Sequence, residues 1–212
     1  MKPLPLILIG GGGHCISCID VIESSGRFHI LGILDPQKPI KSNVLKYEII
    51  GVDEDIIKYL PVCENYFITI GHVKEPQARI SSFQKLKNIG ITLPAIVAKS
   101  AYQSPYSEIG EGTIVMHKAF VNADAKTGMN SIINTGAVVE HGSVIGSHTH
   151  ISTGAYVNGD CRIGDRVFIG SSAVISNGIT VGNDIVIGAG AVVIRSLTQP
   201  GVYAGNPARK IA

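Results

Sequence analysis

The chain has 212 residues, which is enough for one large domain or two small ones, each with an apolar core of its own. Its formal net charge is +2 and 16% of its residues are charged, so neither a nucleic acid nor an anionic membrane surface is an expected partner. The four cysteines are scattered, which favours a reducing compartment, and no apolar run is long enough to span a bilayer. We therefore expect a cytoplasmic protein with two domains.

Alternating strand and helix patterns characterise the first 96 residues. The apolar run at 4–10 is typical of a buried strand, and the glycines after it lead into an amphipathic pattern that Gly26 ends. A second strand, a short helix, a third strand and a helix with Pro76 near its first turn follow at 29–35, 53–60, 66–72 and 75–90. This alternation predicts an α/β domain, in which helices pack on a small parallel sheet.

A six-residue repeat replaces the helical pattern after about residue 97. Of the fifteen positions in this register, fourteen are aliphatic, and Thr127 is the exception. The residue two places earlier is small at twelve of the fifteen, and glycine often follows the aliphatic residue, where a tight corner favours a residue without a Cβ. The positions are Ile109, Val115, Val121, Thr127, Ile133, Val139, Ile145, Ile151, Val157, Ile163, Ile169, Ile175, Val181, Ile187 and Val193.

Such a register predicts a left-handed parallel β-helix, a triangular prism in which each coil consists of three hexapeptides. One large and one small inward residue fill each short side, and residues eighteen apart stack at about 4.8 Å, one strand spacing. After Val193 the register is lost, and Pro200, Gly201 and Pro207 follow. The predicted organisation is an α/β domain at 1–96, a β-helix at 97–195 and a C-terminal tail at 196–212.

Four histidines in or beside the repeats are candidates for a general base, because imidazole accepts a proton near pH 7. Stacking distinguishes two of them: His141 falls between Ala123 and Gly159, whereas His150 falls between two bulky residues. Small neighbours leave room for the His141 imidazole to face a cavity, so His141 is the predicted base. The alternative interpretation is a polar surface residue on a corner of a coil.

A carboxylate beside this histidine would fix its tautomer and stabilise the imidazolium. Glu140 precedes it directly, and Gly142 stacks between Asp124 and Asp160. Each of these three carboxylates is a candidate partner for His141.

Two further motifs favour structural roles. His148 and His150 form an H-x-H pair, but no other ligand at suitable spacing completes a site, so we expect no bound metal. Cys15 and Cys18 form a CxxC motif, which we interpret as two small apolar residues on the sheet-facing side of a helix.

The glycines at 10–13 lie between a strand and a helix, where backbone N–H groups commonly bind phosphate. The dinucleotide fingerprint G-x-G-x-x-G fails, because Cys15 or Ile16 occupies its last position, and no Walker pattern is present. Asp35 ends the second strand, where a carboxylate could hold a ribose or a base edge. A nucleotide other than a dinucleotide is therefore favoured, and a glycine turn that only connects two elements is the alternative.

The chain as a whole resembles the bacterial nucleotide-sugar and sialic-acid acetyltransferases. The resemblance rests on GGGGH at 10–14, LD at 34–35, IG at 70–71, INTGAVVEH at 133–141 and GNPAR at 205–209. It implies a Rossmann-like nucleotide-sugar-binding domain, a hexapeptide-repeat β-helix, and homotrimers with acetyl-CoA in the groove between subunits. It also implies His141 as the base, although Gly142 stands where close relatives often carry an acid after the histidine.

The resemblance further implies which residues meet each ligand. The amide of Gly159 would stabilise the oxyanion of the acyl-transfer step. The implied nucleotide-sugar ligands are Gly12, Gly13, His14, Asp35, Gly71 and, near the sugar, Asn134, and the implied acetyl-CoA ligands are His150, Gly159, Ser171 and Ala189.

The predicted activity is acetyl-CoA-dependent N-acetylation of the 4-amino group of a nucleotide-linked deoxysugar, for bacterial surface glycan or glycoprotein synthesis. A UDP-linked 4-amino-4,6-dideoxy-N-acetylglucosamine is the expected type, with GDP- and dTDP-linked sugars as alternatives. The second enzyme hypothesis is O-acetylation of a sialic acid or a related sugar. A noncatalytic nucleotide-binding β-helix is the hypothesis from another class, while a metal enzyme like the γ-carbonic anhydrases lacks three well-placed histidines.

Overall fold

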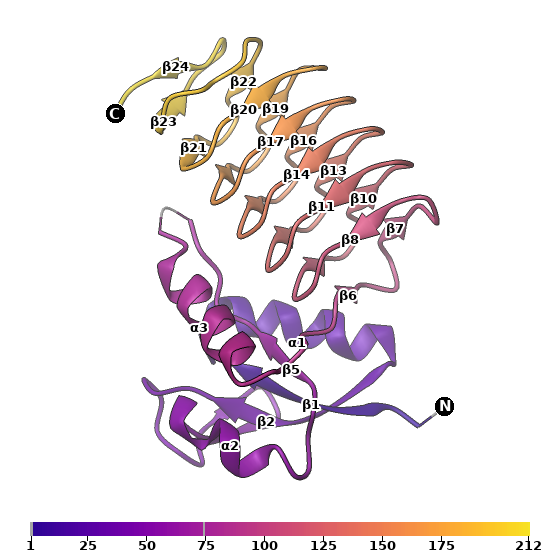
Figure 1. The fold of residues 1–212 in the computed structure, drawn as a ribbon, viewed down its shortest axis with the longest axis vertical. Coiled ribbons are helices and arrows are strands. Elements are labelled where there is room, and N and C mark those ends of the chain that lie inside the picture. Colours follow the sequence, from indigo (N-terminus) through magenta and orange to yellow (C-terminus); the bar gives the residue numbers. More distant parts are fainter. Residues whose placement is uncertain (1, 74) are drawn as a thin grey trace.

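The apolar segments near the N-terminus form a five-stranded sheet in the order β3-β4-β2-β1-β5, parallel except between β3 and β4. The computed structural model describes residues 2–73 and 75–212. The sheet confirms the predicted α/β class of this half (Figure 1). Its strands are β1 (Leu4–Ile9), β2 (Phe28–Leu34), β3 (Asn43–Val44), β4 (Tyr47–Gly51) and β5 (Tyr66–Ile68).

The β3–β4 hairpin was not predicted, and its composition explains why. Its strands are short, and its two turn residues are Leu45 and Lys46 rather than the glycine or asparagine that usually indicates a tight hairpin. Leu45 adopts a positive φ of 53°.

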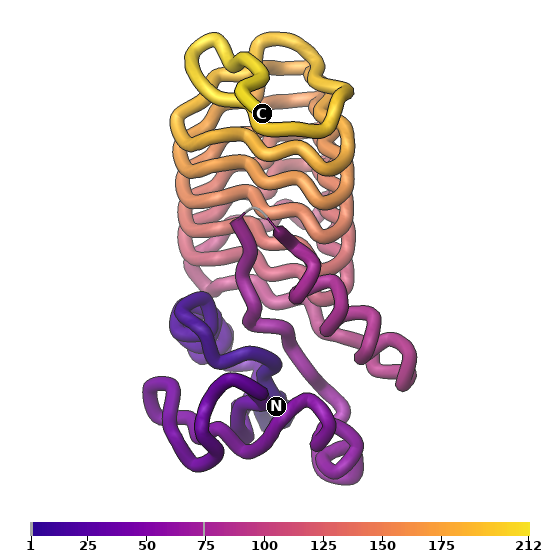
Figure 2. The backbone as a smooth tube through the Cα atoms, turned by 90° about the vertical axis from the view of Figure 1, so that its left-hand side faces the viewer, coloured from indigo at the N-terminus to yellow at the C-terminus, as the bar shows by residue number. Residues whose placement is uncertain are grey.

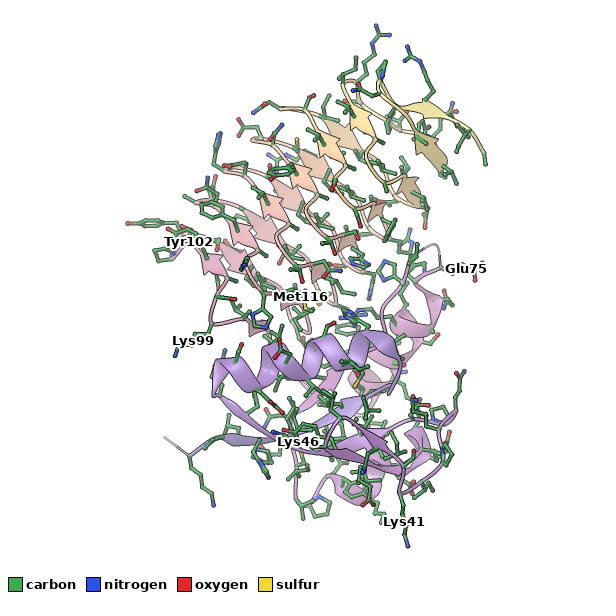
Figure 3. All side chains as sticks on the ribbon, turned by 180° about the vertical axis from the view of Figure 1, so that it is seen from behind. Lys41, Lys46, Glu75, Lys99, Tyr102 and Met116 are labelled. Carbon is green, nitrogen blue, oxygen red and sulfur yellow. The ribbon has the colours of Figure 1, made fainter. Side chains whose placement is uncertain are left out.

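Helices cover both faces of the sheet: α1 (Gly13–Ser25), a 3₁₀ turn (Asp53–Asp55) with α2 (Ile56–Tyr59), and α3 (Gln77–Asn88). The end of α1 at Gly26, with φ of 65°, is as predicted, and the helix begins inside the glycine run, at Gly13. Cys15 and Cys18 lie on its buried side, as the sequence predicted. The helix lies between the sheet and the first coils of the second domain, where it packs with Met116 and Ile114 (Figure 3).

The repeats form the predicted left-handed prism, whose coils stack above the N-terminal domain (Figure 2). We name its three sheets by what their outer sides present. The domain face consists of β6 (Ile96–Val97), β9 (Ile114–Val115), β12 (Ile132–Ile133), β15 (His150–Ile151), β18 (Phe168–Ile169), β21 (Ile185–Ile187), β23 (Gly201–Ala204) and β24 (Arg209–Lys210). The apolar face consists of β7 (Tyr102–Gln103), β10 (Phe120–Val121), β13 (Val138–Val139), β16 (Tyr156–Val157), β19 (Val174–Ile175) and β22 (Val192–Val193). The polar face consists of β8 (Glu108–Ile109), β11 (Lys126–Thr127), β14 (Val144–Ile145), β17 (Arg162–Ile163) and β20 (Thr180–Val181).

Strand pairing follows the predicted eighteen-residue spacing along all three faces. His150 pairs with Ile132 below and Phe168 above, and Val138 pairs with Tyr156. The inward aliphatic and small residues of the repeats form one continuous core, to which Tyr203 of the C-terminal segment also belongs. The segment predicted as a tail therefore packs on the end of the prism, where β23 pairs with β21.

A buried arginine joins the two domains. Arg79 of α3 is 1% exposed, and its guanidinium donates to the carbonyls of Ile68 and Ile70 beside β5. It also donates to the carbonyls of Gly112 and Asn130, which lie in two successive coils of the prism. These contacts fix the end of β5 against the β-helix.

Candidate active site

The glycine-rich loop after β1 is held by two side chains from neighbouring strands. Gly10 has a φ of 96°, and a Cβ there would lie 2.5 Å from the Ile70 side chain, so only glycine fits. The N–H of Gly11 donates to Asp35 Oδ2 at 2.5 Å, and the other oxygen of Asp35 accepts from the N–H of Gln37. Asp35 thus fixes the loop; the ribose or base contact predicted for it stays a prediction.

This loop forms one wall of a cavity of about 750 Å³ that extends to the domain face of the prism. The first turn of α1 opens into it with no acidic side chain of its own, so the free N–H groups and the helix dipole favour an anion there. Five of the predicted nucleotide-sugar ligands line the cavity together with His150, namely Gly12, Gly13, His14, Asp35 and Gly71.

Three histidine rings meet at the end of the cavity nearest the prism. The ring of His150 lies 6.5 Å from that of His14 and 5.3 Å from that of His72, centre to centre. Phe168 packs edge-on against His150 at 5.2 Å. Burial, together with the nearby Arg79 charge, lowers the pKa of His14 and of His72 to about 3 and that of His150 to about 4. All three rings are therefore neutral at physiological pH.

The tautomer of His150 follows from its two hydrogen bonds. Its Nδ1 lies 2.7 Å from the carbonyl of His72, which only accepts, so Nδ1 carries the proton. Its Nε2 lies 3.0 Å from Asn134 Nδ2, which donates to it. Asn134, the predicted sugar ligand, thus orients His150, and the structure groups His150 with the predicted nucleotide-sugar residues. The coenzyme contact predicted for His150 stays a prediction.

The predicted base lies elsewhere, on the corner between the apolar and polar faces. His141 follows β13, precedes β14 and is exposed. Its ring stacks over Gly159 as predicted, because a Cβ on Gly159 would lie 2.6 Å from Cε1 and 2.7 Å from Nε2. The Gly159 N–H has no acceptor among the described residues, which leaves it free to donate to an oxyanion.

The three candidate carboxylates surround this corner without a hydrogen bond to the His141 ring among the described residues. Glu140 accepts from Asn122 Nδ2 in the coil below. Asp160 extends over Gly142, where a Cβ would clash with its Oδ1. Asp124 is exposed at a left-handed corner position. The predicted pairing of His141 with one of them stays a prediction.

The predicted site residues therefore fall into three groups. His141, Gly159 and the carboxylates occupy the corner opposite the domain face, while Ser171 and Ala189 lie on the corner between the domain and apolar faces. The cavity residues form the third group. Since a corner of a triangular prism points away from the opposite face, His141 does not reach the cavity of its own chain.

Two buried residues near the cavity were missed in the sequence, His72 and Arg79. The resemblance implied Gly71 near the end of the predicted third strand, and the histidine that directly follows it was a usable signal. Nothing in the sequence indicated that Arg79 would contact the prism.

Two further expectations concern metals and membranes. Among residues 2–73 and 75–212, no group of three or more potential ligands could hold a metal ion. The rings of His148 and His150 pack against different partners, Phe83 and His72. Within the same residues, no helix combines the length and apolarity needed to cross a membrane.

Comparisons with known protein families agree with this architecture. The model of the PglD N-terminal domain matches residues 5–86, and the model of the hexapeptide repeat of succinyl-transferase matches residues 161–195. No curated protein sequence matches the chain significantly.

Solved structures extend the likeness to the full chain. PerB from Caulobacter crescentus, solved with CoA and GDP-perosamine, has 31% identity and a TM-score of 0.91 over 98% of this chain and 97% of its own. The chain belongs to the nucleotide-sugar N-acetyltransferases of the hexapeptide-repeat family. It is therefore an acyltransferase, as the resemblance implied.

A second acetyltransferase has a similar overlap. The acetyltransferase domain of PglB from Neisseria gonorrhoeae FA1090, solved with acetyl coenzyme A, has 28% identity and a TM-score of 0.88 over 99% of this chain and all of its own. WeeI from Acinetobacter baumannii AYE shares the fold at 21% identity, with a TM-score of 0.82.

Proposed function

We propose that the protein transfers the acetyl group of acetyl-CoA to the 4-amino group of a nucleotide-linked deoxysugar. The observation that carries this proposal is the cavity that extends from the N-terminus of α1 to the domain face of the prism. It supplies a phosphate-binding helix end beside an acyltransferase scaffold, and the neighbour PerB was solved with CoA and GDP-perosamine. A UDP-linked 4-amino-4,6-dideoxy-N-acetylglucosamine is our first candidate, with GDP- and dTDP-linked sugars next.

The orientation of the substrate follows from the cavity lining. The diphosphate would bind at Gly12 and Gly13, where the first N–H groups of α1 are free. The nucleoside would extend toward Asp35 and Asp53, and the sugar toward His72 and the prism. In this orientation the amino group lies at the end where the β-helix and the coenzyme meet.

The chemistry requires one base and one oxyanion donor. The amine attacks the thioester carbonyl, a C–N bond forms, and the C–S bond breaks. His141 accepts the proton that the nitrogen loses, and the departing thiolate of CoA takes up a proton. The N–H of Gly159, the residue on which the His141 ring stacks, has no acceptor among the described residues and would donate to the oxyanion.

The active site requires a second copy of the chain, because His141 and the cavity lie on opposite sides of one prism. The apolar face offers the contact surface: its outward residues are Tyr102, Phe120, Val138, Tyr156, Val174 and Val192. Tyr102 points away from the prism and is half exposed, and its ring stacks on that of Phe120 at 4.7 Å (Figure 3). Burying this face against the next copy would bring His141 of one copy to the cavity of another. A homotrimer is the proposed assembly.

The charge of the cavity argues against a sialic acid. A sugar carboxylate placed beyond the N-terminus of α1 would need a cationic partner, but the charged side chains that line the cavity, within the described part of the chain, are Asp35 and Asp53. The three histidines are neutral. We therefore rank O-acetylation of a sialic acid below N-acetylation of an amino sugar.

Release of free thiol from acetyl-CoA tests the proposal, with UDP-, GDP- and dTDP-linked 4-amino sugars and free sialic acid as acceptors. We expect rapid release with one nucleotide-linked amino sugar. The His141→Asn variant should lower kcat by about 100-fold or more, the usual contribution of a general base, with little change in coenzyme affinity. The exposed His29 of β2 provides the control variant His29→Asn, which should keep full activity.

Release with sialic acid alone would favour the O-acetyltransferase instead. If none of the acceptors causes thiol release, the result would favour a noncatalytic nucleotide-binding protein. Normal turnover by His141→Asn would exclude His141 as the base.

A further inference from the structure

The sugar end of the cavity contains buried polar atoms without partners. His72 is 7% exposed, and neither of its ring nitrogens has a hydrogen-bond partner among residues 2–73 and 75–212. The Nε2 of His14, beside it, is unpartnered in the same way. A buried polar atom left without a hydrogen bond costs about 1–3 kcal/mol, so a site that keeps three of them is built to meet a ligand.

Three other polar side chains of the cavity lining are already paired. His150 uses both of its ring nitrogens, on the carbonyl of His72 and on Asn134. Both oxygens of Asp35 accept backbone N–H groups, and the hydroxyl of Thr69 donates to backbone carbonyls. His72 therefore presents two unused ring nitrogens at this end of the cavity.

His72 is also positioned to contact the sugar. It follows β5 and lies beyond the loop that would bind the diphosphate, and its own carbonyl is bonded to His150 of the β-helix. Its ring packs against His150 at 5.3 Å and Phe168 at 6.5 Å, so the imidazole has a fixed place. Whatever occupies the space between the two domains meets His72.

We infer that His72 hydrogen-bonds the sugar of the nucleotide sugar and is a specificity-determining residue of the reaction. This inference rests on the proposed function and names a contact that the function itself does not require. A neutral imidazole offers one donor and one acceptor. A sugar hydroxyl or an acylamino substituent, which both donates and accepts, can therefore pair with either ring nitrogen.

The test uses three variants of His72 in the full-length protein and two ligands. Calorimetry measures the Kd of the nucleotide amino sugar that the wild type acetylates and the Kd of the matching nucleoside diphosphate. We expect His72→Ala to weaken binding of the nucleotide sugar about tenfold, the effect of one lost hydrogen bond, and to change nucleoside diphosphate binding less than about twofold.

The amide variants identify the nitrogen that binds the sugar. The amide nitrogen of Asn superimposes on Nδ1 of histidine and that of Gln on Nε2, so His72→Asn or His72→Gln should recover most of the lost affinity, whichever matches the bonded atom. His29→Gln is the control, because His29 is exposed on β2 away from the cavity. Thermal unfolding of each variant confirms that it is folded.

Equal weakening of both ligands would mean that His72 only supports the loop, and unchanged affinity would mean that it does not meet the sugar; each result overturns the inference. A wild type that acetylates amino sugars while His72→Ala behaves normally would refute this inference alone. A wild type that acetylates no nucleotide-linked amino sugar would refute the proposed function and this inference together.

Discussion

The cavity at the domain boundary and the corner that carries His141 are built in opposite ways. The cavity brings together His14, His72 and His150, which come from three distant segments, and His72 and His150 are buried there. The corner is made by the repeat itself, in which the ring of His141 stacks on Gly159, the residue eighteen places later. His141 is exposed there. Tertiary packing completes the first region within a single chain.

The second region is incomplete in a single chain. Among residues 2–73 and 75–212, nothing hydrogen-bonds the His141 ring or accepts the N–H of Gly159, and both residues lie at the edge of an uncovered apolar face. The contrast indicates a division of labour, in which each chain holds a nucleotide sugar by itself but acquires a base only from a neighbouring copy.

A charge introduced on the apolar face should have the largest effect on activity, because it would prevent a neighbouring copy from supplying His141. Tyr156 is 47% exposed at the centre of the face. Tyr156→Glu should convert the assembly to single chains in sedimentation experiments and reduce acetyl transfer to less than about 1%. Thr180→Glu, on the polar face, is the matched control and should leave both properties unchanged. A fully active assembly of Tyr156→Glu chains would show that another surface makes the contact.

Removal of Arg79, the arginine between the two domains, should destabilise the domain boundary that forms the cavity and leave the His141 corner intact. Arg79→Met leaves four carbonyls without their donor, at three buried hydrogen bonds and one part-buried one, and we expect a loss of about 3 kcal/mol in the free energy of unfolding, measured with urea. The control is Arg166→Met, because Arg166 pairs with Asp184 on the surface, where an ion pair contributes less than about 1 kcal/mol. Equal losses in the two variants would mean that Arg79 does not hold the domains together.

A methyl group at Gly159 should disturb the corner alone. The added Cβ would lie 2.6 Å from the His141 ring and displace it, so Gly159→Ala should lower kcat about 30-fold, equivalent to about 2 kcal/mol, without changing nucleotide-sugar affinity. The control is the same substitution in a His141→Ala background, where the imidazole is already absent and the extra methyl should change nothing. A further loss in that background would indicate that Gly159 acts independently of His141.

The cavity histidines should make the stability of the fold depend on pH. Their pKa values in the folded protein, about 3 for His14 and His72 and about 4 for His150, lie below the ordinary value of 6.5. The unfolded chain thus binds protons more readily, so stability is complete above about pH 6.5 and falls as pH decreases toward about 4. Each neutral histidine contributes a slope of about 1.4 kcal/mol per pH unit.

Urea unfolding at several pH values measures this slope. His150→Asn keeps a donor for the carbonyl of His72 but removes one titrating ring, so its slope should be smaller by one proton. An identical slope in the variant would show that His150 is not neutral in the folded protein.

Sequence reasoning succeeded where position along the chain determines surroundings. In the prism every neighbour lies eighteen residues away, so the environment of His150 between Ile132 and Phe168 and the stacking of His141 on Gly159 were both predictable. The glycine-rich loop and Asp35 were predictable because strand ends of a parallel sheet meet at one edge.

The remaining contacts depend on how the two domains lie against each other, which no local pattern encodes. In the sequence, Arg79 has the pattern of an ordinary charged residue of an amphipathic helix. In the structure it is buried and donates to the carbonyls of Gly112 and Asn130, which are 33 and 51 residues away. The role of His72 likewise depends on His150, which is 78 residues further along the chain. The opposite placement of His141 and the cavity depends on which face of the prism the N-terminal domain covers.

Mixing two inactive variants tests most directly whether neighbouring copies share the active site. Gly12 has open space around its Cα, so Gly12→Leu should block the cavity without straining the fold, while His141→Asn removes the base. Co-expressed chains that assemble at random should recover about a quarter of the wild-type activity, because about one site in four combines an intact cavity with an intact His141 from its neighbour. Recovery to that level would support a site shared between copies, whereas mixed assemblies that stay inactive would mean that each chain supplies its own base and would contradict the account.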